Sequence, residues 1–304
     1  MNTIMQQKHT LKDWLLATRP WSFTASGLTV LTALIYLWWL TGEVNWTNGV
    51  WAIVGIILFH AAGNTWSDYH DYRSGVDTVE GAYAVQTLAG GFFAPKQVRN
   101  LSLGLLVVAV AVGLWLLWQS GWGLLWIGLG GLICTMCYPA LKYRALGDFT
   151  ILMAYGFLPA IGTSYVALGE VDWRVLWVAL PIGLLVDSIL HANNTRDMAT
   201  DGKAGIRTMA HGLGLRASAA LYVFEVLFPF VWVVVLVPFG IFPLWSLVLV
   251  VVMRVAMGLS RTMREYKENE KIEWIAALDQ RSAMLQMLFC LVMILSLVVD
   301  CLLR

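Results

Sequence analysis

The sequence predicts an all-α, polytopic membrane protein with nine transmembrane helices. Hydrophobic residues make up 59% of the 304 residues and charged residues only 13%, a balance outside the range of ordinary soluble domains. The mean hydropathy is +0.70. A helical span needs roughly 20 apolar residues. Segments that meet this requirement lie at residues 21–41, 49–66, 98–118, 121–140, 149–168, 173–194, 217–237, 240–259 and 282–302.

The chain before the first span predicts which end of the protein faces the cytoplasm. Residues 1–19 are polar and lack the apolar stretch and cleavage site of a signal peptide, so we expect a cytoplasmic lead-in. With this end inside, all of the 20 Lys and Arg residues except Arg174 and Arg304 fall on the cytoplasmic side, as the positive-inside rule requires. The spans then place the C-terminus outside, and we expect a multi-pass protein of the cell (inner) membrane.

The connections between the spans differ in length on the two faces. The outer ones are short, as at residues 119–120 and 238–242, whereas the inner ones are long and polar, at 67–97, 141–148, 195–216 and 260–281. Functional residues concentrate in long loops. We therefore expect one membrane domain over residues 1–304, with cytoplasmic active-site loops at 67–97 and 195–216.

Two polar clusters interrupt the apolar chain, each at the cytoplasmic end of a span. The first consists of Asn64, Asp68 and Asp71 in GNTWSDYHDYRSGVD, and the second of Asn193, Asp197 and Asp201 in HANNTRDMATDGKAGIRT. At about 100° per residue, each trio shares one helix face. A single Asp at a span end is commonly just solvated, but two trios in the same order favour a ligand site. Because Mg²⁺ takes carboxylate and amide oxygens and completes its shell with water and phosphate, we expect a site for Mg²⁺ and a diphosphate.

Other polar residues lie near the clusters in the sequence. Donors suited to phosphate oxygens are Arg73, Tyr138, Lys142, Lys203 and Arg207. Asp187 lies six residues before Asn193, which is about 9 Å deeper in the membrane, and an ionisable group at that depth is a functional candidate. His191 lies one turn from Asp187 on the same face. We expect this pair either to bind an acceptor or handle a proton, or to form a structural hydrogen bond.

These segments resemble the motifs of a known family. NTWSDYHDYRSGVD and NNTRDMATDGKAGIRT are similar to the two Asp-rich motifs of the UbiA superfamily of intramembrane prenyltransferases, YPALKYRALGD to the segment between them, and RPWSFTASGLTVLTALIY to its first span. The resemblance covers nearly the whole chain. It implies a bundle of nine helices around a central cavity open to lipid, and transfer of an isoprenyl group from its diphosphate to an aromatic acceptor.

The resemblance also implies roles for the residues above. The first cluster would bind Mg²⁺ and diphosphate, and the second cluster a further Mg²⁺. Lys142, Lys203 and Arg207 would hold phosphate oxygens, and Tyr138 would orient the diphosphate or the acceptor. Within the superfamily, NxxxDxxD followed by GxD, and NNxRDxxTDxxAGxRT, look most like the enzymes that prenylate 1,4-dihydroxy-2-naphthoate to demethylmenaquinone.

Other functions remain open at this point. A UbiA-type enzyme could use another acceptor, such as 4-hydroxybenzoate, homogentisate, chlorophyllide or haem. An ion-coupled transporter also carries intramembrane carboxylates, but its sites usually lie near the bilayer midplane, whereas both clusters here lie at span ends. The expected partners are a polyprenyl diphosphate, a small aromatic acceptor and the lipid bilayer, with no nucleic acid. The sequence does not indicate an oligomeric state.

Overall fold

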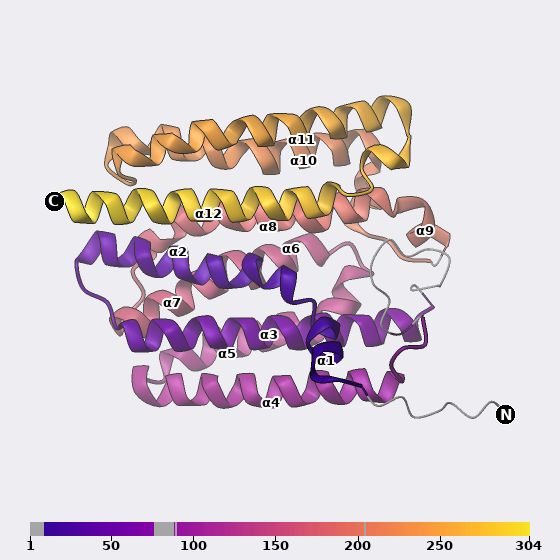
Figure 1. The fold of residues 1–304 in the computed structure, drawn as a ribbon, viewed down its shortest axis with the longest axis horizontal. Coiled ribbons are helices and arrows are strands. Elements are labelled where there is room, and N and C mark those ends of the chain that lie inside the picture. The colour runs from indigo at the N-terminus through magenta and orange to yellow at the C-terminus, as the bar shows by residue number, and fades with distance from the viewer. Residues whose placement is uncertain (1–8, 76–87, 89, 204) are drawn as a thin grey trace.

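The computed structural model describes residues 9–75, 88, 90–203 and 205–304, and their regular structure is helical apart from one isolated backbone bridge between Arg144 and Arg207. The long helices run nearly parallel in a bundle (Figure 1). The α-helices are α1 (Leu11–Ala17), α2 (Phe23–Thr41), α3 (Trp46–Arg73), α4 (Pro95–Ser120), α5 (Gly123–Lys142), α6 (Gly147–Ile151), α7 (Leu158–Leu168), α8 (Leu176–Arg196), α9 (Met198–Lys203), α10 (Met209–Leu236), α11 (Leu249–Asn269) and α12 (Leu278–Leu303).

Short helical segments of other types connect or extend these helices. A π-helical segment, η2 (Leu152–Phe157), joins α6 to α7. The 3-10 turns are η1 (Pro20–Ser22), η3 (Trp173–Val175), η4 (Val237–Phe239), η5 (Leu244–Val248) and η6 (Ile272–Trp274). In the part of the chain that the structure describes, nine helical segments are long and apolar enough to cross a membrane. The prediction of an all-α, multi-pass membrane protein is confirmed.

Several helices continue beyond the ends that hydrophobicity predicts. Helix α3 runs on to Arg73, α10 begins at Met209 and α11 ends at Asn269, so parts of the expected inner loops are helical. Hydrophobicity marks only the stretch in contact with hydrocarbon, whereas the hydrogen bonds of a helix continue into the polar layer. Residues 76–87 of the first expected active-site loop lie outside the described residues.

Helix α8 occupies the middle of the bundle (Figure 1). Val178, Ile182 and Leu185 are fully buried in it, and it packs against α10 and α12. On its other side it crosses η2 very closely, because Gly183 meets Gly156 there without any side chain between the two backbones. This crossing places the second cluster, at the end of α8, beside the ends of α3 and α5.

Candidate active site

A cavity of about 620 Å³ lies between α2, α3, α4, α5, α7 and α8. Most of its wall is apolar, with residues such as Val30, Leu117 and Leu132. At the end where α3 and α8 finish, the wall becomes polar. The polar residues there include Arg19, Asn64, Asp71, Lys142, Asn193 and Arg196. Both clusters therefore contribute to one cavity, although they are more than 100 residues apart in the chain.

The first cluster lies on the last three turns of α3. The amide nitrogen Nδ2 of Asn64 donates to the carbonyl of Thr18 and to Ser22 Oγ, both at 3.0 Å. The amide oxygen Oδ1 is then the group left to accept from a donor or bind a cation. Asp68 is buried and pairs with the guanidinium of Arg19.

Asp71, at the end of the same face, is surrounded by donors. Its carboxylate accepts from the Tyr143 hydroxyl at 2.5 Å, from Ser67 Oγ at 3.2 Å and from Lys142 Nζ at 3.3 Å. Burial, followed by the charge of Asp71, raises the pKa of Tyr143, so this phenol stays protonated and keeps donating. The first cluster is therefore held in place by residues of the lead-in and of α5.

Arg19 reaches Asp68 through an unusual backbone conformation. It has φ 57° and ψ 59°, in the left-handed region, although it is neither Gly nor Asn and precedes Pro20. Such a conformation costs about 1–3 kcal/mol and is concentrated at functional sites. The turn between α1 and η1 thus directs the Arg19 side chain onto α3.

Arg196 holds the second cluster together. Its guanidinium makes two parallel bonds to the carboxylate of Asp197, Nε to Oδ1 at 2.8 Å and Nη2 to Oδ2 at 2.9 Å, and also bonds Asn193 Oδ1. Nη1 donates to Asp279 Oδ2 at 3.0 Å and to the carbonyl of Ala276 at 3.2 Å. Arg196 was not among the site residues predicted from the sequence, although its position between Asn193 and Asp197 in NNTRD could have indicated a role at the site.

Lys142 stands between the two clusters. It bonds Asp71 and also interacts electrostatically with Asp201. Burial raises the pKa of Asp201 to about 6, an effect that Lys142 opposes and Asp197 reinforces. The charge of Lys142 therefore acts on carboxylates of both clusters.

Three of the expected phosphate donors lie elsewhere or cannot be placed. Arg73 is exposed and lies over the ring of Tyr69. Arg207 is also exposed, and its backbone N–H bonds the carbonyl of Tyr143 at 3.4 Å. Lys203 ends α9, and its side chain is outside the described part of the chain. Of the predicted donors, Lys142 and Tyr138 line the cavity.

Asp187 and His191 are buried but are not each other's partners. His191 Nδ1 lies 2.8 Å from Asp148 Oδ1, and its Nε2 lies 2.9 Å from Ser218 Oγ. Oδ1 of Asp187 has no hydrogen-bond partner among the described residues. Neither Asp187 nor His191 belongs to the lining of the cavity. Asp148 was not predicted as the partner of His191, because the two residues lie 43 positions apart in the chain.

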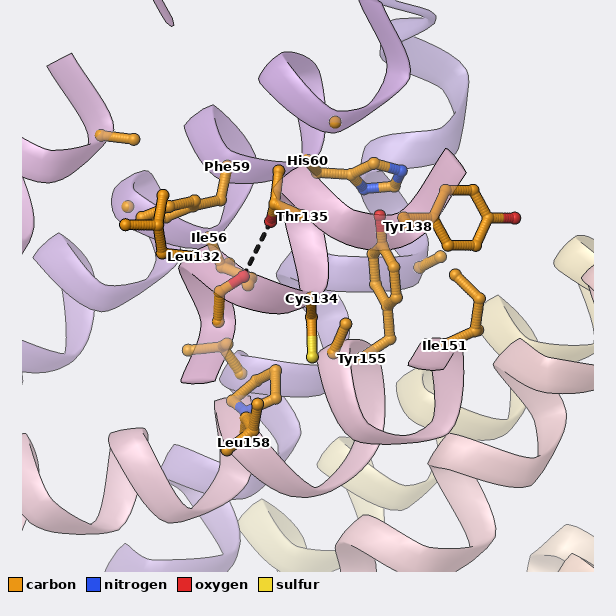
Figure 2. Close-up of a pocket in the computed structure, with 18 of the residues that line it drawn as sticks. Ile56, Phe59, His60, Leu132, Cys134, Thr135, Tyr138, Ile151, Tyr155 and Leu158 are labelled. Carbon is orange, nitrogen blue, oxygen red and sulfur yellow. Dashed lines mark hydrogen bonds between the residues drawn. The ribbon is translucent and has the colours of Figure 1, made fainter. Parts of the chain in front are cut away.

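Two further aromatic residues that the sequence argument did not single out line the cavity next to Tyr138 (Figure 2). They are His60 and Tyr155. Their ring centroids lie 4.8 Å apart with the planes at 72°. His60 comes from α3 and Tyr155 from η2, so neither motif pattern nor sequence spacing relates them.

The oxygen donors of the clusters fit Mg²⁺ in chemical type. Among the described residues, no three His, Cys, Asp or Glu side chains stand together as a complete metal site. Mg²⁺ commonly binds through only one or two carboxylates and completes its shell with water and substrate phosphates. The carboxylates and the amide oxygen of Asn64, for which the described residues provide no donor, suit that mode of binding.

Comparisons with known proteins identify a family for this chain. A model of the UbiA prenyltransferase family matches residues 27–298. UbiA prenyltransferase domain-containing protein 1 of Danio rerio is 34% identical over 215 residues, which are 69% of this chain and 63% of that protein, so the chain spans less than two thirds of its length. The Drosophila melanogaster homologue is 31% identical over 265 residues, 84% of this chain and 72% of that protein.

Solved structures share the fold at low sequence identity. A structure reported for digeranylgeranylglyceryl phosphate synthase superposes with a TM-score of 0.65 at 16% identity, covering 94% of this chain and 98% of that one. A UbiA homologue from Archaeoglobus fulgidus bound to GPP and Mg²⁺ gives 0.60 at 15% identity, covering 93% and 99%.

Proposed function

The chain belongs to the UbiA prenyltransferase family, and on that basis we propose that it transfers a polyprenyl group from its diphosphate to an aromatic acceptor with the help of Mg²⁺. One observation carries the proposal. A single cavity joins a polar end, lined by Asn64, Asp71, Asn193 and Lys142, to a long apolar wall. A polyprenyl diphosphate has the same two parts, a charged head and an apolar tail.

Mg²⁺ would be held by Asn64, Asp68 and Asp71 and by Asn193, Asp197 and Asp201, where it would offset the charge that grows on the diphosphate as the C–O bond breaks. Lys142 is placed to donate to the phosphate oxygens between the clusters. Arg19 fixes the carboxylate of Asp68, and Arg196 fixes that of Asp197. The apolar wall keeps water from the allylic fragment, so that it reacts with a carbon of the aromatic ring.

For the acceptor we propose 1,4-dihydroxy-2-naphthoate. The new C–C bond would form as pyrophosphate leaves the prenyl group, and the ring would lose its carboxyl group as CO₂, which would give the quinol form of demethylmenaquinone. The support is the form of the two motifs, NTWSDYHD followed by GVD, and NNTRDMATDGKAGIRT. An electron-rich, hydroxylated ring is the acceptor type that an allylic electrophile requires. We also propose that the site opens on the cytoplasmic side, because the Lys and Arg residues gather at that end of the spans.

The test of prenyl transfer uses the purified protein in nanodiscs with a prenyl diphosphate and 1,4-dihydroxy-2-naphthoate, with pyrophosphate release and product mass as readouts. We expect transfer with Mg²⁺ or Mn²⁺ and none with EDTA. The Asp68→Asn, Asp197→Asn double variant should lose at least about a hundredfold in rate, the scale of removing charge stabilisation from a transition state. Asp172→Asn is the control, because Asp172 pairs with Arg174 away from the cavity. Undiminished transfer by the double variant would refute the proposal.

A parallel screen with 4-hydroxybenzoate and homogentisate tests the acceptor. Prenylation of 4-hydroxybenzoate without any reaction of 1,4-dihydroxy-2-naphthoate would overturn the acceptor assignment and leave prenyl transfer standing.

A further inference from the structure

His60 lies in the cavity wall directly below the first cluster. It precedes Asn64 by four residues on α3, which is about 6 Å along the helix axis. A diphosphate bound at the cluster would therefore place the first carbons of the prenyl chain near the level of His60. Figure 2 shows the rings of His60, Tyr138 and Tyr155 gathered on one side of the cavity.

Two serine hydroxyls fix the ring of His60. Its Nε2 lies 3.2 Å from Ser22 Oγ and its Nδ1 lies 2.9 Å from Ser26 Oγ. Both ring nitrogens are thus used by the wall of the cavity. His60 offers the ligand a rigid aromatic surface and no free base.

Tyr155 offers a surface and also a free polar group. Its ring meets that of His60 edge to face, a favourable arrangement for aromatic pairs. In the described part of the chain, neither the hydroxyl of Tyr155 nor that of Tyr138 has a hydrogen-bond partner. Most of the neighbouring wall consists of aliphatic side chains such as Ile56, Leu132 and Leu158. A phenol in such surroundings lacks a partner that a ligand can supply.

We propose that the aromatic acceptor binds against His60 and Tyr155, and that the Tyr155 hydroxyl is the hydrogen-bond partner of an acceptor ring hydroxyl. This inference rests on the proposed function. A polyprenyl tail has no atom that could accept this bond, whereas a hydroxylated aromatic acid has several. Tyr138 lies one turn from Lys142, on the diphosphate side of this subsite. Asp187 and His191 do not line the cavity and are not part of the proposed subsite.

Tyr155→Phe removes only the hydroxyl and keeps the ring. We expect KM for the acceptor to rise about tenfold, the usual loss for one hydrogen bond to a polar ligand, while KM for the prenyl diphosphate stays unchanged. Tyr36→Phe is the matched control, because Tyr36 is also a tyrosine of the membrane interior but bonds the carbonyl of Ile241 away from the cavity. It should change neither KM.

Acceptor analogues that lack one hydroxyl test the contact itself. We would measure 1-hydroxy-2-naphthoate and 4-hydroxy-2-naphthoate as inhibitors of the wild type and of Tyr155→Phe. In the wild type, the analogue that lacks the contacted hydroxyl should bind more weakly than the dihydroxy acid. In Tyr155→Phe, the same analogue and the dihydroxy acid should bind with equal affinity. If the affinity of each analogue relative to the dihydroxy acid is the same in the wild type and in Tyr155→Phe, the contact is absent.

A second readout does not depend on turnover. In a background without the native cysteines, Tyr155→Cys should react with a thiol reagent, and the acceptor should slow this reaction while pyrophosphate with Mg²⁺ should not. Protection of the thiol by pyrophosphate alone would refute the proposed acceptor subsite. An acceptor KM that is unchanged in Tyr155→Phe but raised in Asp187→Asn would also refute it. Absence of prenyl transfer by the wild type would refute the proposed function instead, and acceptor protection of the thiol would still report the subsite.

Discussion

Arg196 is the side chain on which the geometry of the second cluster depends most. It is 8% exposed, and its guanidinium bonds Asn193, Asp197 and Asp279 at once. A planar fork with five donors can satisfy all these acceptors, whereas the single ammonium group of Lys cannot. Arg196 thereby fixes the end of α8 to the start of α12 and sets the direction of the Asp197 carboxylate.

Arg196→Lys is therefore expected to weaken catalysis without removing charge. Side chains that orient metal ligands typically contribute 10–100-fold to metal affinity or activity. We therefore expect kcat/KM to fall by about tenfold or more, and the Mg²⁺ concentration that gives half-maximal activity to rise. Arg174→Lys is the control. Arg174 makes a comparable double contact with Asp172, with Nε to Oδ1 at 3.0 Å and Nη2 to Oδ2 at 2.6 Å, but away from the cavity. Equal effects of the two substitutions would show that Arg196 has no special role at the site.

Among the elements, η2 and α8 cross closely next to the cavity. A Cβ added at Gly156 would lie 3.0 Å from Gly183 Cα, a separation at which the backbones must move apart. The same π-helical segment carries Tyr155. Because π-helical turns are frequent at functional sites, the close crossing and the position of the Tyr155 ring belong to one local arrangement.

Gly156→Ala is expected to destabilise the protein by about 1–3 kcal/mol, as overpacking does in a close-packed interior. It should also raise acceptor KM, because η2 would shift away from α8. Gly104→Ala, in α4, is the control, since a Cβ there meets nothing within 4 Å and Ala favours helix by up to about 1 kcal/mol. Thermal unfolding in detergent measures both variants. A Gly156→Ala protein as stable as the wild type would contradict the steric argument.

At the scale of the whole molecule, the polar end of the cavity and the C-terminus lie at opposite ends of the bundle. Helix α9, which follows the second cluster, is at one end, and α12 finishes at the other (Figure 1). Nine spans and the distribution of Lys and Arg predict that the α9 end faces the cytoplasm.

Cysteine labelling of intact cells tests this orientation. After replacement of the native cysteines, Ser120→Cys, at the end of α4, should react with an impermeant thiol reagent from outside. Glu268→Cys, near the end of α11, should react only after the membrane is made permeable. Ser120 ends the third span and Glu268 lies near the end of the eighth. Because the third and eighth spans cross the membrane in opposite directions, the two positions lie on opposite faces, and each serves as the control of the other. The reverse labelling pattern would show that the protein has the opposite orientation in the membrane.

The sequence by itself determined the elements of this protein and the chemistry of one end of it. Hydrophobic length is a local property, so the spans could be counted without a structure. Helical periodicity placed the first Asn/Asp trio on one face of α3, but the prediction of one shared helix face was wrong for the second trio, because α8 ends at Arg196 and Asp201 lies in α9. The ends of the helices were less predictable, because α3 and α11 continue past the apolar stretch.

Only the tertiary structure decided which side chains complete the site. Arg19 meets Asp68 across 49 residues, and Arg196 meets Asp279 across 83. The pairing of His191 with Asp148 rather than Asp187, and the meeting of His60 with Tyr155, likewise come from helix packing. Such contacts depend on how helices cross, and no pattern within a single helix contains that information. The two clusters could be recognised because the residues of each lie within two or three turns of one segment.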